Sequence, residues 1–159
     1  MPVWPSEEWS KAYMELINDS AEYKEAAADW EGTVVYHFQA EPDRSLAEDV
    51  YGLFDLWHGK CRDARQVTSD EASGAEFMVS APYSTWKQVV RRELEPMRAV
   101  MQGRLKLKGD LAKAVRYTKA TLILQDLSTK VPDTEFLDEL PPERLRELRE
   151  EGQPVVVPE

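Results

Sequence analysis

The feature that most constrains this 159-residue sequence is a change of apolar period between residues 101 and 117, MQGRLKLKGDLAKAVRY. From residue 104 to residue 108 apolar and basic residues alternate, which predicts a half-buried strand. From Leu111 onward the apolar residues follow a helical spacing. Between them, Gly109 permits a tight turn and Asp110 is a favourable N-cap. The segment therefore predicts a strand, a turn and a long helix whose apolar sides face one interior.

This segment resembles the signature of the sterol carrier protein two family, whose members are small lipid-binding domains. The residues that carry the resemblance are 103–110, GRLKLKGD, and residues 77–83, FMVSAPY, followed by Trp86. The likeness runs from about Ser6 to Lys130. It implies that residues 1–130 form an α+β domain with a five-stranded, largely antiparallel sheet, covered by helices around an apolar lipid tunnel. Residues 131–159 then form a C-terminal extension with a short helix and an extended arm.

Local patterns in the rest of the chain agree with this architecture. Before residues 101–117, four stretches have the composition or the alternation that is typical of strands. The second of them, Glu48–Trp57, is apolar on both faces, which is typical of a strand that is covered on each side. Ser6, Ser20 and Ser84 are each placed to cap a helix. The four predicted strands are Thr33–Gln39, Glu48–Trp57, Cys61–Thr68 and Ala75–Ala81.

Length and composition exclude several classes of protein. A chain of this length is expected to form one domain with a sizeable core. The net charge of −10 argues against general binding of nucleic acid. No apolar run is long enough for a transmembrane helix, and the N-terminus does not have the pattern of a secretory signal, so we expect a cytoplasmic protein. A single cysteine, Cys61, excludes an internal disulfide framework.

Positive charge is concentrated between residues 87 and 119. This segment holds ten basic and three acidic residues, a net charge of +7, so the remainder of the chain carries −17. The segment is interpreted either as solvated faces of a strand and helices, or as a positive rim that attracts a carboxylate, a phosphate or a membrane headgroup. The sequence leaves both interpretations open. The residues that we assign to such a headgroup rim are Lys106, Lys108 and Lys113.

The sequence predicts no catalytic residue, no metal site and no cofactor. His37 and His58 are the only histidines, and no third ligand is spaced to bind a metal with them. Cys61 has no evident histidine to activate it, so it is interpreted as a small core residue. Asp55, within the apolar strand, is interpreted as a solvent-facing or hydrogen-bonded residue and not as a catalytic acid.

The resemblance implies that the sheet, the methionine-containing helix before residue 103 and the last helix of the domain enclose the tunnel. Flexible methionine side chains suit ligands of varied shape. The apolar residues that we assign to the tunnel lining are Phe54, Leu56, Phe77, Trp86, Leu94, Met97, Met101, Leu105, Leu107, Leu111, Val115 and Leu122.

The expected function is non-enzymatic binding or transfer of a lipid such as a fatty acid, a fatty acyl-CoA or a sterol-like amphiphile. Transient contact with a membrane surface and a homodimer are both compatible with the sequence. Two alternatives stay open. One is a structural or regulatory homodimer whose cavity is filled by its own side chains or by the C-terminal arm. The other is an accessory domain of a lipid-metabolising enzyme.

Overall fold

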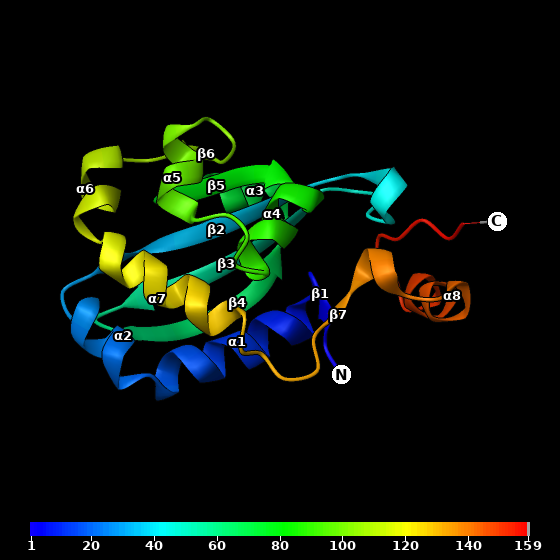
Figure 1. Ribbon diagram of the computed structural model, residues 1–159, viewed down its shortest axis with the longest axis horizontal. Helices are drawn as coiled ribbons and strands as arrows, with labels where there is room; N and C mark the ends of the chain where they lie inside the picture. Colours follow the sequence, from blue (N-terminus) through cyan, green and yellow to red (C-terminus); the bar gives the residue numbers. More distant parts are fainter. Residues whose placement is uncertain (159) are drawn as a thin grey trace.

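The computed structural model describes residues 1–158 and is built around one sheet (Figure 1). Its strands are β2 (Glu31–Gln39), β3 (Val50–Trp57), β4 (Lys60–Val67), β5 (Phe77–Pro82) and β6 (Lys106–Lys108). They lie in the order β4-β3-β2-β5-β6. Only β2 and β5 run parallel, and the other neighbouring pairs are antiparallel. The predicted α+β class and the five-stranded, largely antiparallel sheet are confirmed.

Most helices cover one face of this sheet. They are α1 (Glu7–Asp19), α2 (Ala21–Ala26), α4 (Tyr83–Val90), α5 (Pro96–Met101), α6 (Leu111–Arg116) and α7 (Thr118–Ser128). Figure 1 shows α7, α5 and α4 in front of the strands. The opposite face is covered in part by α3 (Ser69–Ser73), which closes a small cluster of Val35, Leu53 and Val67 through Ala72. No helix among residues 1–158 is long and apolar enough to cross a membrane.

Two of the three serines that were predicted to cap helices do so. Ser6 accepts a hydrogen bond from the Trp9 N–H at 3.1 Å, and Ser20 accepts one from the Tyr23 N–H at 3.0 Å, as predicted. Ser84, in contrast, lies inside the first turn of α4. Its N–H and hydroxyl donate to Glu41 at 2.7 and 2.8 Å, so the expectation that Ser84 is a cap is wrong.

The helix after Asp110 is broken. Asp110 caps α6 as predicted, accepting from the Ala112 N–H at 3.0 Å, but α6 ends at Arg116 and α7 begins at Thr118. At the break, the Tyr117 ring meets the Trp30 ring edge-on at 4.8 Å, and its hydroxyl lies 3.1 Å from Asp29 Oδ1. The prediction of one long helix is wrong, because these contacts favour a bent path over a straight one.

The C-terminal extension packs onto the end of the domain. It contains β7 (Glu135–Phe136), the 3₁₀ turn η2 (Leu137–Glu139) and α8 (Pro142–Glu150). β7 pairs in parallel with the N-terminal β1 (Val3–Trp4). The buried apolar residues of the extension join the main core. That residues 1–130 fold without the extension stays a prediction. The buried apolar residues of the extension are Val131, Leu137, Leu145, Leu148 and Val155.

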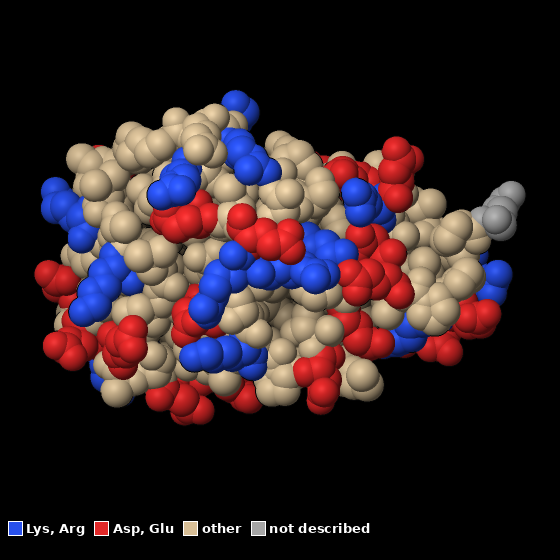
Figure 2. Space-filling model, viewed as in Figure 1, with Lys and Arg blue, Asp and Glu red and all other residues tan. Residues whose placement is uncertain are grey.

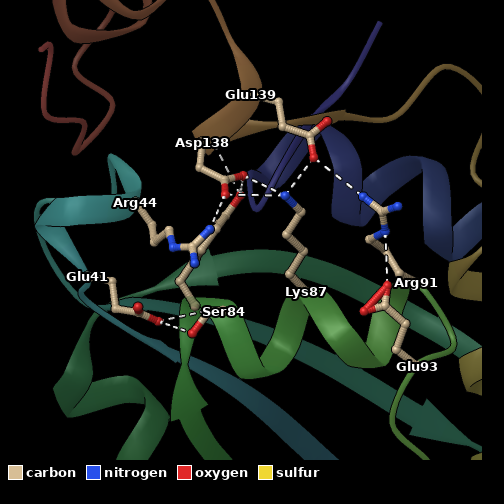
Figure 3. A network of polar contacts seen from close by, with 9 residues as sticks. Glu41, Arg44, Ser84, Lys87, Arg91, Glu93, Asp138 and Glu139 are labelled. Atoms are coloured by element: carbon tan, nitrogen blue, oxygen red, sulfur yellow. Dashed lines mark hydrogen bonds and ion pairs between the residues drawn. The ribbon is translucent and has the colours of Figure 1, made fainter.

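An ionic network holds this extension in place (Figure 3). Lys87 of α4 lies between the carboxylates of Asp138 and Glu139, at 3.0 and 2.6 Å. The hydroxyl of Tyr83 donates to Asp138 at 2.8 Å, and Arg44 lies 3.3 Å from it. Burial opposes the charge of Asp138, but the hydrogen bonds from Lys87 and Tyr83 outweigh it and lower its pKa. Asp138 is therefore the centre of the network.

The turn at Gly109 gives a first prediction. Gly109 has a φ of +133°, and a Cβ there would lie 2.5 Å from the Phe77 ring and 2.9 Å from the Glu76 carbonyl oxygen. Gly109→Ala should therefore lower the free energy of unfolding by more than the roughly 1–2 kcal/mol of backbone strain alone. Gly103→Ala is the control, since its φ is +76° and no atom lies within 4 Å of its Cβ position. Equal denaturant midpoints for the two variants would contradict the close packing at Gly109.

The network at Asp138 gives a second prediction. Asp138→Asn should lower the free energy of unfolding by roughly 1.5–3 kcal/mol, because the buried Tyr83 and the partly buried Lys87 lose a charged acceptor. Since the folded-state pKa is lowered, this contribution is complete above pH of about 4 and is lost as the pH falls further. Thermal melts between acid and neutral pH measure both effects.

Glu139→Gln is the matched control for this second prediction. Glu139 binds the same lysine but is half exposed, so this substitution should lower the free energy of unfolding by less than about 1 kcal/mol. A loss at Asp138 no larger than that at Glu139 would show that the network does not hold the extension.

Candidate functional site

A cavity lies between the helix-bearing face of the sheet and helices α1, α2, α4, α5, α6 and α7. Strand alternation directs Val34, Tyr36 and Phe38 of β2 into it, and Leu105 and Leu107 close it at the β6 edge. Its volume is about 130 Å³, well above the roughly 10–15 Å³ that a single water needs. The cavity is therefore large enough to accept part or all of a small apolar molecule.

The cavity wall is strongly aromatic. Ten lining residues are aromatic, and they include four of the five tryptophans. The rings support one another: Trp86 lies 5.0 Å from Tyr36 and 5.2 Å from Phe38, and Trp30 lies 5.3 Å from Phe77. The indole N–H of Trp86 also donates to the His37 carbonyl oxygen at 2.8 Å. These contacts hold Trp86 and Trp30 in place within the wall.

Among the described residues, no Asp, Glu, Lys, Arg or His lines the cavity. The tyrosines stay neutral, because burial raises the pKa of Tyr36 to about 12 and raises that of Tyr13 well above its ordinary value. The side-chain amide of Gln125 donates hydrogen bonds to the carbonyl oxygens of Val89 and Leu94, at 3.1 and 2.8 Å. The cavity therefore suits an uncharged apolar group, and an anionic group would have to remain outside it.

One polar atom near the cavity is unpaired. The indole Nε1 of Trp4, a lining residue, is the only buried side-chain nitrogen or oxygen of residues 1–158 without a hydrogen-bond partner. The ring itself is held by Phe38 at 5.4 Å, Tyr83 at 5.0 Å and Phe136 at 5.6 Å. Through Phe136, the C-terminal extension thus supports the cavity wall from outside.

The structure brings half of the predicted lining residues to the cavity. Phe54 and Leu94 are buried but belong to the surrounding core. Met101, Leu111, Val115 and Leu122 do not line the cavity and are exposed, by 61%, 43%, 43% and 42% respectively. The predicted residues that do line the cavity are Leu56, Phe77, Trp86, Met97, Leu105 and Leu107.

For the predicted lining residues of α6 and α7 that are exposed, the prediction chose the wrong side of the helix. In α6 and α7 the residues that face the cavity include Ala114, Tyr117, Thr121 and Leu124, whereas Val115 lies outside. Both sides of these helices carry apolar residues, so the helical period identifies two stripes without saying which one faces inward. Sequence reasoning also did not assign to the lining the aromatic residues from the N-terminal third of the chain, although Trp9 and Tyr13 stand at helical spacing. These aromatic residues include Trp4, Trp9, Tyr13, Tyr23 and Trp30.

The three predicted rim lysines do not lie together. Lys106 pairs across the sheet with Ser80, and Lys108 with Met78, on the face opposite to Leu107 and the cavity. The structure does not place these two at the pocket. Lys113 lies outside the wall, 4.8 Å above the Trp30 ring, and donates to Glu76 at 2.6 Å and to the Glu31 carbonyl oxygen at 2.8 Å.

The histidines and the cysteine lie away from the cavity. His37, on the opposite face of the sheet, is 2.8 Å from both Ser80 and Asp49. Burial raises the pKa of Cys61 to about 12, which leaves the thiol neutral, and it donates to the Asp63 carbonyl oxygen at 3.3 Å. Within residues 1–158 no cluster of His, Cys, Asp and Glu could hold a metal ion.

The sequence model of the SCP-2 sterol transfer family matches residues 11–121, which include most of the sheet and of the cavity wall. The chain belongs to this family. A crystal structure of sterol carrier protein 2 is 35% identical in sequence, with a TM-score of 0.73, and the match covers 79% of this chain and 97% of that one. The SCP-2 fold expected from the strand–turn–helix segment is thereby confirmed.

Two further solved structures share this SCP-2 fold. A conserved hypothetical protein of Thermus thermophilus is also 35% identical, with a TM-score of 0.72 over 79% of this chain and 87% of that one. Apo sterol carrier protein 2 of Yarrowia lipolytica is 15% identical, with a TM-score of 0.50 over 76% and 88%, and shows the similarity of fold alone. No curated protein sequence matches the chain.

Proposed function

We propose that this protein binds one lipid molecule in the aromatic cavity and carries it without changing it chemically. The observation that carries the proposal is the uncharged wall with its ten aromatic residues, in a member of a sterol transfer family. A wall of this kind stabilises a ligand mainly by removing apolar surface from water. It offers no charged group to act as acid or base, which favours a carrier over an enzyme.

The ligand class that we propose is a fatty acid, a fatty acyl-CoA or a sterol-like amphiphile whose apolar part enters the cavity. Burying a chain of about sixteen carbons is worth roughly 12 kcal/mol before the costs of association and ordering. The polar end stays at the surface, near Lys113, which is the one predicted rim lysine beside the wall. The cavity has room for only part of such a chain, so α5, α6 or α7 must yield to admit the rest.

Two observations support a cavity that is available to a ligand. No lining residue comes from beyond Ser128, so the described part of the C-terminal arm does not fill the cavity. Instead the arm packs near η1 (Pro42–Arg44), where Val155 pairs with Leu46. The arm thus leaves the cavity open, which weakens the alternative of a self-filled structural protein.

Filling the cavity tests the proposal. Ala114 lines the cavity from α6, and Ala112, on the same helix, is exposed and does not. Ala114→Phe should weaken binding of a fluorescent fatty acid or a fluorescent sterol roughly tenfold, because overpacking costs about 1–3 kcal/mol. Ala112→Phe adds the same ring outside and should bind like the wild type. Fluorescence titration measures both affinities and the stoichiometry, which should be one per chain.

Two results would refute the proposal. One is the absence of saturable binding of either probe to the wild-type protein. The other is equal affinity in the Ala114→Phe and Ala112→Phe variants, which would place the bound probe elsewhere on the surface. Circular dichroism of both variants separates a filled cavity from a failure to fold.

A further inference from the structure

The wall of the cavity holds one hydrogen-bond donor that the protein leaves unpaired. Trp4, on β1, is fully buried and lines the cavity, and its indole Nε1 has no partner in the part of the chain that the structure describes. The neighbouring rings of Phe38 and Phe136 carry no polar atom. The hydroxyl of Tyr83, the third neighbour, donates to Asp138. A buried donor without an acceptor is rare in folded proteins and marks a place where another molecule can supply one.

The other tryptophans of the wall find their partners within the protein. The indole N–H of Trp9 donates to Thr134 Oγ1 at 3.0 Å. Those of Trp30 and Trp86 donate to backbone carbonyl oxygens of β2, at 3.0 and 2.8 Å. Among the four tryptophans of the described wall, only Trp4 therefore has a donor that is available to a molecule in the cavity.

The position of Trp4 separates this donor from the charged end of a ligand. β1 lies at the end of the sheet that faces α8, and α6, which carries Lys113, lies at the other end (Figure 1). A headgroup near Lys113 is therefore at the far end of the cavity from Trp4. An oxygen atom that meets the Trp4 N–H belongs to the buried part of the ligand.

The surroundings of Trp4 restrict the kind of oxygen that it can bind. An indole N–H only donates, so its partner must carry a lone pair. No charged side chain of the described residues lines the cavity, whereas Figure 2 shows acidic and basic side chains spread over the molecular surface. A carboxylate or a phosphate beside Trp4 would lose its hydration without gaining a counter-charge, which is strongly unfavourable. The partner is therefore an uncharged oxygen, of a hydroxyl, a ketone or an ester.

We propose that Trp4 donates a hydrogen bond to an uncharged oxygen in the buried part of the ligand, so that the cavity prefers neutral oxygenated lipids to hydrocarbons of the same shape. The inference rests on the proposed lipid-binding function and names the chemical class of ligand for the same cavity. Fatty alcohols, fatty esters and sterols all present such an oxygen. Trp4 and Phe136, which supports its ring, both lie outside residues 11–121, so this preference does not follow from the family match.

The indole N–H signals in heteronuclear NMR spectra of the wild-type protein test the hydrogen bond directly. Decanol and undecane have the same length and differ in one terminal group, a hydroxyl in place of a methyl. Decanol should move the indole proton of Trp4 downfield, because a hydrogen bond deshields this proton, and undecane should not. The signal of Trp9 is the internal control, since its N–H is already bonded to Thr134 and should respond equally to both molecules.

Displacement of the fluorescent fatty acid measures what the hydrogen bond adds to the affinity. Trp4→Phe should weaken the binding of decanol relative to undecane roughly fivefold, which corresponds to about 1 kcal/mol for one hydrogen bond. Trp9→Phe is the matched control. It also removes an indole from the wall, but one whose N–H has a protein partner, so the ratio of the two affinities should keep its wild-type value. The pair of cholestanol and cholestane repeats the measurement and distinguishes a sterol from a fatty chain as the source of the oxygen.

Two results overturn the inference: a Trp4 signal that responds equally to alcohol and hydrocarbon in both pairs, or an affinity ratio in Trp4→Phe that equals that of the wild type in both pairs. The NMR shifts are measured on the wild type, so they decide even if Trp4→Phe does not fold. If the fluorescent fatty acid binds but the Trp4 signal does not distinguish alcohol from hydrocarbon, only this inference fails. If the alcohol shifts the Trp4 signal but neither fluorescent probe binds, the proposed function fails and the donor role of Trp4 stands. No binding of any of these molecules refutes both.

Discussion

A cavity persists in a close-packed protein only if its wall cannot collapse into it, and here mutual support among aromatic rings meets that condition. Trp86 contacts both Tyr36 and Phe38 and donates its indole N–H to the backbone of β2, so sheet and helix hold it from two sides. Trp30 is fixed between Phe77 and Tyr117 in the same way. Large planar groups with few rotatable bonds span the gap between sheet and helices without filling it. The shape of the interior and the position of α4 against the sheet depend on these rings.

The sequence allowed better predictions for the sheet than for the helices. Strict alternation in residues 104–108 predicted β6 and its turn at Gly109, and the same alternation already directs Lys106 and Lys108 away from Leu107 and the cavity. The rim prediction overlooked that consequence. In α6 and α7 the helical spacing was predicted correctly, but the side that faces the cavity was not. Both sides of these helices carry apolar residues, and only the packing against the sheet decides which side is buried. The order of the strands came from the family resemblance, since local periodicity carries no information on which strands pair.

The C-terminal extension illustrates what a family resemblance leaves out. The family match ends at residue 121, yet Leu137, Leu145 and Leu148 are buried in the same core as the matched segment. Phe136 supports Trp4, and Asp138 binds a lysine and a tyrosine of α4. These contacts join residues that are distant in sequence, and no local pattern predicts them. The extension thus takes part in holding the cavity wall, although the domain signature does not contain it.

The break at Tyr117 has a consequence for the timing of exchange. Because the turn at Gly109 bounds α6 on one side and the break at Tyr117 bounds it on the other, this six-residue helix is a separate short segment. Short segments of this kind open locally at a free energy well below that of global unfolding. On the proposed function, local opening of α6 would set the residence time of a bound lipid, while the sheet sets the melting temperature of the domain. On that function, substitutions in α6 or at Tyr117 would change how long a lipid is retained without changing the stability of the sheet.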